Sequence, residues 1–293
     1  MPEGDVVWRT ATRLNSALAG HEVTVWDLRW PSLATTDLRG STVIEVVSAG
    51  KHLLCRLLRE DQRFTLHSHL RMEGSWHVRP SAESATGGPR AGSHGRQLRE
   101  ADIRAVVATR AWTTIGYRLG MLDLVTTDAE HRLIGHLGPD VLGAGWDQEA
   151  VLTTLAAHPD RAIGELLLDQ RVLAGVGTFY MSEALFLRGL SPWTPAGSLG
   201  ASDLVGLVEL VHRLLSANRD RAVQITTGDA RRGRTNYVHA RAGRPCRRCG
   251  EPLRVEMIGE APRERTAFFC PRCQPGPTPA VSPGRSGRAL RRR

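Results

Sequence analysis

The chain has 293 residues, of which 41% are hydrophobic and 24% charged, with a formal net charge of +9 and a sequence pI of 10.3. This length and composition predict a soluble protein with two ordinary domains or one large domain. No segment approaches the roughly 18 uninterrupted apolar residues of a membrane span, and the first residues do not resemble a signal peptide, so we expect a cytoplasmic protein. The positive charge favours a polyanionic partner such as nucleic acid, although a general arginine bias also explains it.

The start of the chain, Met1-Pro-Glu-Gly-Asp5, admits two interpretations. Removal of Met1 would expose the secondary amine of Pro2 beside the carboxylate of Glu3. A terminal amine has a pKa of roughly 7.7 to 8.0, against about 10.4 for lysine, so a fraction of it is neutral and nucleophilic near pH 7. Alternatively, Pro2 opens a helix whose dipole is complemented by Glu3 and Asp5, with apolar residues following at helical spacing: Val7, Ala11, Leu14 and Leu18. Taken alone, these residues favour the helix start. However, Lys51 is the only lysine among the 39 lysines and arginines, so amine chemistry has few other positions.

The region up to about residue 130 is predicted to form strands. Short β-branched or alternating runs, broken by glycine and polar turns, occur at 23–26, 42–47, 52–58, 63–70, 103–108 and within 112–126. Residues 80–97 are rich in serine, glycine and alanine and predict a mobile loop. Many short strands with one long helix favour a β-sandwich that carries the N-terminus.

From residue 136 the pattern changes to helices. Asp147, Asp160 and Ser202 are candidate N-caps, and an apolar stripe follows at Leu204, Leu207, Val208, Val211, Leu214 and Leu215. Gly175 and Gly177 precede another helical pattern. Backbone amides at such a helix start suit a phosphate oxygen, although an ordinary turn between helices explains these glycines equally well.

Four of the five cysteines form two CxxC pairs separated by twenty residues: Cys246, Cys249, Cys270 and Cys273. This spacing is typical of a four-thiolate zinc ribbon, whereas disulfides are disfavoured in a chain without a secretory signal. The fifth, Cys55, is expected to be an inert strand residue. Residues 275–293 are rich in proline, glycine and arginine and predict a disordered basic tail.

Together these segments resemble the formamidopyrimidine-DNA glycosylase and endonuclease VIII family of base-excision repair enzymes. The resemblance covers residues 2–274. It is carried by the start MPEGD, by 48–54 (SAGKHLL), 69–74 (HLRMEG), 136–140 (HLGPD) and 168–186, and by the zinc ribbon. It implies an α+β multi-domain fold with a β-sandwich catalytic domain (1–130) bearing the N-terminal helix, a helix-two-turn-helix domain (136–235), a four-cysteine zinc-finger hairpin (236–274) and the tail (275–293).

The resemblance implies specific catalytic roles. The amine of Pro2 would attack the sugar of a damaged nucleotide, expel the base and form a Schiff base, after which elimination nicks the strand. A proton for the departing base and the opening sugar ring is within reach of Glu3. Lys51 would contact phosphate and the reacting sugar, a task for a compact ammonium that a guanidinium does not replace.

The resemblance also implies DNA contacts. Met72, with Arg71 beside it, matches the position that fills the space left by a flipped base, although a core methionine on a strand is the alternative. Arg265 would grip phosphates bidentately. Gly177 and Thr178 match the helix-two-turn-helix turn, where the family usually has asparagine after the glycine. Threonine offers one donor instead of two, so phosphate affinity could fall by roughly 1 kcal/mol.

We therefore expect a monomeric, nucleoid-associated DNA glycosylase and abasic-site lyase, with one structural zinc ion and no organic cofactor, acting on damaged duplex or single-stranded DNA. The start PEGD and the short segment around Met72 favour oxidised pyrimidines, with purine lesions as the alternative. Two other classes stay open: a catalytically weak DNA-binding protein on this fold, and a zinc-ribbon RNA-binding or translation factor. The latter leaves MPEGD without a role.

Overall fold

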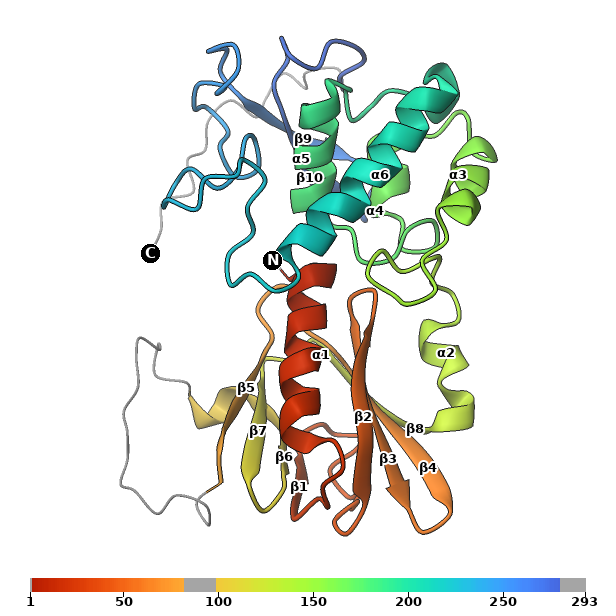
Figure 1. Cartoon of the computed structure of the whole chain (residues 1–293), viewed down its shortest axis with the longest axis vertical. Helices are drawn as coiled ribbons and strands as arrows, with labels where there is room; N and C mark the ends of the chain where they lie inside the picture. The colour runs from red at the N-terminus through yellow and green to blue at the C-terminus, as the bar shows by residue number, and fades with distance from the viewer. Residues whose placement is uncertain (1, 82–98, 280–293) are drawn as a thin grey trace.

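The computed structural model describes residues 2–81 and 99–279, which form a β-sandwich and a helical domain with the N-terminus at their junction (Figure 1). The predicted mobile loop lies almost entirely outside these residues, as does most of the predicted tail. None of the helices within the described ranges is long and apolar enough to cross a membrane.

Two antiparallel four-stranded sheets make the sandwich. One has the order β1-β6-β7-β5 and the other the order β2-β3-β4-β8. Their bounds are β1 Val25–Leu28, β2 Thr42–Ala49, β3 His52–Arg59, β4 Gln62–His69, β5 Ser75–Pro80, β6 Ile103–Ala108, β7 Trp112–Tyr117 and β8 Met121–Thr126. The sequence predicted these strands except β5, whose half-exposed, polar residues lack an apolar alternation.

Helix α1 (Gly4–Leu18) runs along the sandwich and buries one face, including Val7, Ala11, Leu14 and Leu18, against β2 and its neighbours. Pro2 is not the first helical residue, as the helix interpretation required. The backbone of Glu3 is extended and α1 begins only at Gly4, because the Glu3 side chain is held by the other domain.

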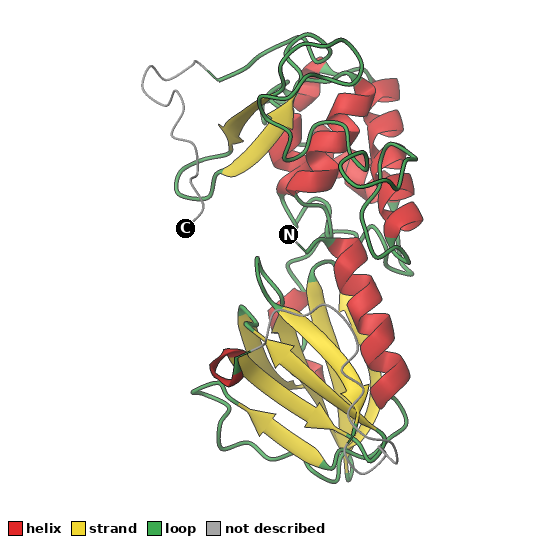
Figure 2. Cartoon of the chain, turned by 90° about the vertical axis from the view of Figure 1, so that its left-hand side faces the viewer, coloured by secondary structure: helices red, strands yellow, loops and turns green. Residues whose placement is uncertain are grey.

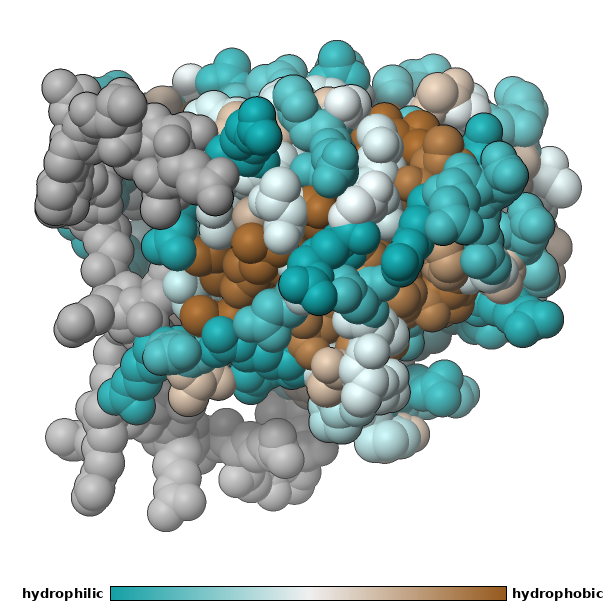
Figure 3. Space-filling model, turned by 90° about the horizontal axis from the view of Figure 1, so that it is seen from below, coloured by the Kyte–Doolittle hydropathy of each residue, from teal (hydrophilic) through white to brown (hydrophobic). Residues whose placement is uncertain are grey.

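At the end of the sandwich farthest from the helical domain, apolar side chains are visible in patches divided by hydrophilic ones (Figure 3).

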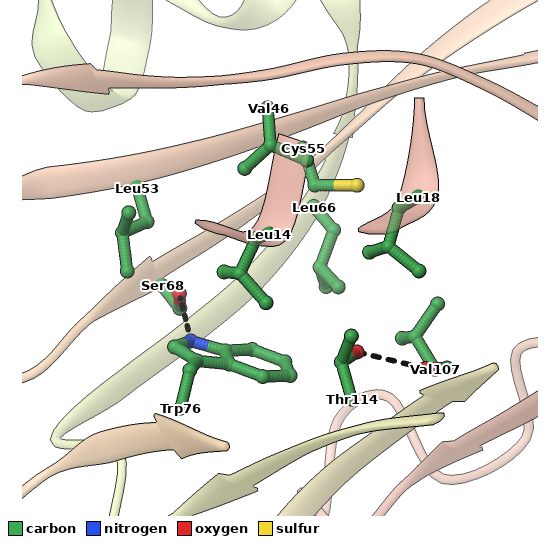
Figure 4. A pocket seen from close by; sticks show the side chains of 10 residues that line it. All are labelled: Leu14, Leu18, Val46, Leu53, Cys55, Leu66, Ser68, Trp76, Val107 and Thr114. Carbon is green, nitrogen blue, oxygen red and sulfur yellow. Dashed lines mark hydrogen bonds between the residues drawn. The ribbon is translucent and has the colours of Figure 1, made fainter. Parts of the chain in front are cut away.

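The sandwich interior contains a void of about 20 Å³ between α1 and the two sheets (Figure 4). The hydrogen-bonding side chains of Trp76, Ser68 and Thr114 that line it already have partners, since Trp76 donates to Ser68 and Thr114 donates to the carbonyl of Val107. A water molecule would find too few partners there, so we expect the void to be dry. Cys55 lines it, and burial raises the pKa of this thiol to about 12, as expected for an inert strand residue.

The helical domain surrounds one buried helix, α5. A linker that contains the short elements η3 Thr127–Ala129 and α2 His131–Ile134 leads to α3 Gln148–Ala156, α4 Ile163–Leu168, α5 Thr178–Arg188 and α6 Ala201–Asn218. The predicted stripe of α6 packs against α5. Beyond α6, β9 Arg254–Ile258 and β10 Arg265–Phe269 form an antiparallel hairpin beside α5 (Figure 2).

Of the three predicted N-caps, only Asp147 caps a helix; it accepts a hydrogen bond from the amide of Ala150 at 3.0 Å. Asp160 is not a cap, because a bridge between Ala162 and Pro195 keeps the chain extended until α4 begins. Ser202 lies inside α6, whose first carbonyl acceptor belongs to Gly200.

Candidate active site at the domain junction

The carboxylate of Glu3 reaches across the junction into the start of α5. It is fully buried: Oε2 accepts hydrogen bonds from the amides of Gly177 (2.8 Å) and Tyr180 (3.3 Å), and Oε1 accepts one from the amide of Phe179 (2.7 Å). A Cβ atom on Gly177 would lie 2.5 Å from this carboxyl group, so only glycine fits. The amide of Gly177, which the sequence offered to a phosphate, is therefore occupied by a side chain of the protein itself.

Burial raises the pKa of Glu3 above the usual glutamate range, against the opposing effects of the Lys51 charge and the Phe179 and Gly177 amides. A carboxyl group in this environment holds a proton more readily than an exposed one. Pro2, directly before it, is half-buried, and the amide of Gly4 donates to the carbonyl of Gly175 at 2.8 Å. The carbonyl of Gly175 and the amides at the start of α5 thus fix the start of the chain.

Lys51 approaches the same turn from the sandwich. Its Nζ donates to the carbonyl of Val176 at 2.6 Å, and the same oxygen accepts from Nε2 of Gln170 at 2.9 Å. Gln170 Oε1 in turn accepts from the amide of Gly175. Burial lowers the pKa of Lys51; the Glu3 carboxylate opposes this shift and the Arg265 charge adds to it.

The turn that carries Lys51 is fixed by Asp140, the last residue of the HLGPD segment. Oδ2 of Asp140 accepts from the amide of Gly50 at 2.9 Å, and Oδ1 accepts from the amide of Leu142. Gly50 has a φ of +57°, a conformation that favours glycine, and a Cβ atom at this position would lie only 3.0 Å from the Cβ of Ala174. Burial raises the pKa of Asp140. This acid orients the lysine turn, a role that sequence reasoning missed.

Met72 and Arg71 project from the loop between β4 and β5. Met72 is 67% exposed, so it is not the core methionine that the alternative interpretation required. Arg71 is exposed and has a left-handed backbone with φ of +50°, an uncommon conformation for a residue other than glycine. An exposed, unbranched apolar side chain at the tip of a constrained loop is available for insertion between bases.

Arg265 and Thr178 lie on the helical side of the junction. Arg265 is exposed at the start of β10 and lines an open cleft of about 960 Å³, together with His136, Gln170 and Arg171. Thr178 is the first residue of α5 and is only 5% exposed. Its hydroxyl is therefore much less accessible than the guanidinium of Arg265.

The four paired cysteines converge at the base of the β9–β10 hairpin. All four sulphur atoms lie within 4.8 Å of one another, with Cys246 and Cys273 at 3.9 Å and Cys249 and Cys270 at 3.5 Å. Sulphurs around a tetrahedral zinc ion with bonds of about 2.3 Å lie about 3.8 Å apart, so this donor set fits such an ion. The cluster can hold a metal ion.

Two further buried acids were missed from the sequence. Glu183, in the middle of α5, accepts from the amides of Tyr237, Val238 and His239, each at 2.8 Å. Asp5 accepts from Nε2 of Gln224. Asp5 therefore holds the segment that leads from α6 to the cysteine cluster near its start, and Glu183 holds it nearer the cysteines. A single charge inside the otherwise uncharged and mostly apolar 178–187 run was the available signal for Glu183. Asp5 had no signal beyond its position.

Comparison with known proteins agrees with this arrangement. Residues 1–109 match the formamidopyrimidine-DNA glycosylase N-terminal domain, and residues 137–228 match the formamidopyrimidine-DNA glycosylase H2TH domain. The chain is 49% identical over 292 residues to "Probable endonuclease 8 2" of Streptomyces coelicolor, covering 100% of both chains. It is 40% identical over 274 residues to "DNA-(apurinic or apyrimidinic site) lyase Nei2" of Mycolicibacterium smegmatis, covering 94% of this chain and 99% of that one.

Among solved structures, Lactococcus lactis Fpg bound to DNA containing an abasic site is similar, with a TM-score of 0.72 and 22% identity. The match covers 94% of this chain and 100% of that one. At this identity the likeness establishes the fold, which is the predicted β-sandwich followed by a helix-two-turn-helix domain and a cysteine-bearing hairpin.

Proposed function

The chain belongs to the formamidopyrimidine-DNA glycosylase family, and from this premise we propose that it excises oxidised bases and nicks the resulting abasic site through a Schiff base on Pro2. Once Met1 is removed, the secondary amine of Pro2 attacks the anomeric carbon of the damaged nucleotide and the base departs. The resulting iminium is the electron sink for β-elimination, and δ-elimination follows.

The arrangement around Glu3 is the observation that carries this proposal. Glu3 adjoins Pro2, has a raised pKa and is fixed by the backbone amides at the start of α5, so it can deliver a proton to the opening sugar ring. Lys51 is held at the same turn through the Val176 carbonyl and supplies positive charge beside the reacting sugar and its phosphate. An ordinary helix start would not need a buried carboxyl in this position.

For the DNA contacts we propose that Met72, supported by Arg71, fills the space left by the flipped nucleotide, since it is highly exposed on a constrained loop. Arg265 binds phosphates flanking the lesion from the rim of the cleft. Thr178 contributes little directly, because it is nearly buried, and Gly177 serves by leaving room for Glu3.

We propose that the metal ion is a single structural zinc ion held by Cys246, Cys249, Cys270 and Cys273. Four thiolates complete a tetrahedral site, so its contribution is to fold the hairpin that bears Arg265. The division into residues 1–130, 136–235, 236–274 and 275–293 stays our proposal for the domain organisation. The protein would act as a monomer on DNA of the nucleoid.

Oxidised pyrimidines are the favoured substrates. Relatives named endonuclease 8 or Nei2 are 40% to 49% identical, whereas a formamidopyrimidine-DNA glycosylase from Methylococcus capsulatus is 33% identical. A panel of single-lesion oligonucleotides, in duplex and single-stranded form, separates pyrimidine from purine lesions. Faster release of formamidopyrimidine or 8-oxoguanine would replace this preference with its alternative.

A catalytically weak DNA-binding protein is the second candidate, favoured by threonine at position 178. Borohydride reduction with an abasic-site oligonucleotide decides between the two. We expect a covalent adduct with the wild type and none with Pro2→Gly or with a protein that retains Met1. Gel retardation by all three proteins, with no adduct from the wild type, would leave only binding.

A further inference from the structure

A layer of histidines lies beside Lys51 on the outer face of the sheet β2-β3-β4-β8. His52 pairs with His69 across β3 and β4, and His67 shares their face because it is two residues before His69. The ring of His52 stacks on that of His67 with centroids 5.0 Å apart, and it meets the rings of His69 (5.0 Å) and His136 (6.1 Å) edge-on. None of these histidines has a role in the proposed reaction.

Hydrogen bonds join part of this layer into a chain that ends at an acid. Nδ1 of His67 lies 2.9 Å from Oδ2 of Asp123, and Nε2 of His67 lies 2.8 Å from Nδ1 of His52. His67 is 1% exposed and His52 is 9% exposed, whereas the side chain of Asp123 is 43% exposed. The chain therefore connects solvent at Asp123 with the buried neighbour of Lys51.

The partners fix the tautomer of each neutral ring. A carboxylate only accepts, so the proton of His67 is on Nδ1 and its Nε2 accepts the Nδ1 proton of His52. Nδ1 of His69 accepts from the amide of Arg71 at 2.9 Å, which leaves the proton of His69 on Nε2. A second proton on His69 would set two donors against each other.

The surrounding charges favour the neutral rings. Burial lowers the pKa of His52 to about 3 and that of His69 to about 4, and the charge of Lys51 contributes to both shifts. Arg71 also opposes a charge on His69, and His67, His69 and His136 oppose one on His52. Around His67 the acids are Asp123 and Glu130; Glu130 is bound by Arg56 and Thr65.

We propose that Asp123 and His67 are positioning residues that hold His52 in a single neutral tautomer next to Lys51, while the amide of Arg71 fixes the tautomer of His69. If the Asp123 acceptor is removed, the proton of His67 can sit on Nε2, which then becomes a donor. His52 must then carry its proton on Nε2 and accept at Nδ1, so the change at the surface is transmitted to the lysine turn. This inference rests on the proposed function for its effect on catalysis, and its structural part is independent of that function.

Nitrogen-15 labelling of the histidines tests the tautomers without DNA. Long-range proton–nitrogen spectra at pH 7.5 should give an Nδ1 proton on His52 and His67 and an Nε2 proton on His69. Asp123→Ala should convert His52 into a mixture of tautomers. A wild-type His52 with its proton on Nε2 at this pH would overturn the proposal.

Kinetics then test the positioning. Residues that orient the neighbours of a catalytic group typically contribute 10-fold or more to the rate. Asp123→Ala should therefore slow abasic-site cleavage by about 10-fold, with DNA affinity changed less than about 2-fold. Asp27→Ala is the matched control, since Asp27 has the same 43% side-chain exposure and pairs with Arg29 on the other sheet.

His67→Gln and His67→Phe separate the hydrogen bond from the packing. Glutamine can accept from His52 and should retain most of the rate, whereas phenylalanine can stack but not accept and should resemble Asp123→Ala. Cleavage by Asp123→Ala at the wild-type rate, or equal rates in the two His67 variants, would refute the positioning role. A wild type that forms no adduct would instead refute the proposed function, and the tautomers would still decide this inference.

Discussion

Replacing Glu3 with glutamine tests the central feature of the site, because it alters the charge and one acceptor while keeping the shape. Both carboxylate oxygens accept short hydrogen bonds, from Gly177 and Phe179. Glutamine has one carbonyl oxygen, so its amide group must face one of these N–H donors. The loss of this hydrogen bond leaves a buried N–H group without an acceptor and is expected to cost about 1 to 3 kcal/mol of folding free energy.

Because the pKa of folded Glu3 is raised, the difference in unfolding free energy between Glu3→Gln and the wild type depends on pH with a known sign. Below pH 4.5, the ordinary value, Glu3 is protonated in both the folded and the unfolded chain. Above it the unfolded chain ionises first, so the wild type loses stability with each pH unit until the folded pKa is passed. Glutamine does not titrate. The free energy of unfolding of the variant should therefore rise relative to that of the wild type by up to about 1.4 kcal/mol per pH unit in this window.

Urea unfolding of the two proteins at half-unit steps from pH 4 to pH 7 measures this difference. In parallel, single-turnover base release should be slower in the variant by about 10² to 10⁴, the usual range for a lost general acid, with DNA binding retained. A stability difference that stays constant over this range would falsify the buried-acid interpretation. Base release at the wild-type rate would remove Glu3 from the mechanism.

Three further substitutions test the other parts of the molecule. Arg265→Ala should weaken DNA binding for all sequences and reduce the salt slope by about one unit, and an unchanged slope in titrations at several salt concentrations would exclude a phosphate contact. Cys270→Ser should abolish the one equivalent of zinc measured by metal analysis and weaken DNA binding, with the sandwich still folded by circular dichroism; full zinc occupancy would contradict the four-cysteine site. Val107→Ile adds a methyl group next to the void in the sandwich and should raise the unfolding midpoint by about 2 °C in calorimetry, whereas a lower midpoint would mean that the void cannot accept it.

The strands, the α6 stripe and the cysteine site could be predicted because each depends on local periodicity or on fixed spacing. The partners of Glu3 could not, since they lie more than 170 residues away and are backbone amides that leave no mark in the sequence. Helix starts failed for a related reason. Asp160 and Ser202 have good capping chemistry, but a bridge at Ala162 and the carbonyl of Gly200 determine where those helices begin.

The histidine layer was equally inaccessible from the sequence. His67 and His69 alternate along a strand, as surface residues do, and the face that they share is covered only because the linker folds back over it with Glu130 and His136. Burial of that face is thus a tertiary property. A polar face under a linker is costly unless its groups are paired, which explains why the hydrogen-bonded chain ends at Asp123.

Glu3 and Lys51 depend on both domains, because the hydrogen-bond partners of each side chain lie in the other domain. Glu3 and Lys51 belong to the sandwich side, yet their partners are the amides of Gly177 and Phe179 and the carbonyl of Val176. In return, the turn at Gly50 is held by Asp140 of the linker. A shift of one domain against the other would therefore break the contacts of the acid and of the lysine together. The proposed reaction needs both groups at one sugar, and an orientation set by shared backbone contacts would keep them correctly placed relative to each other.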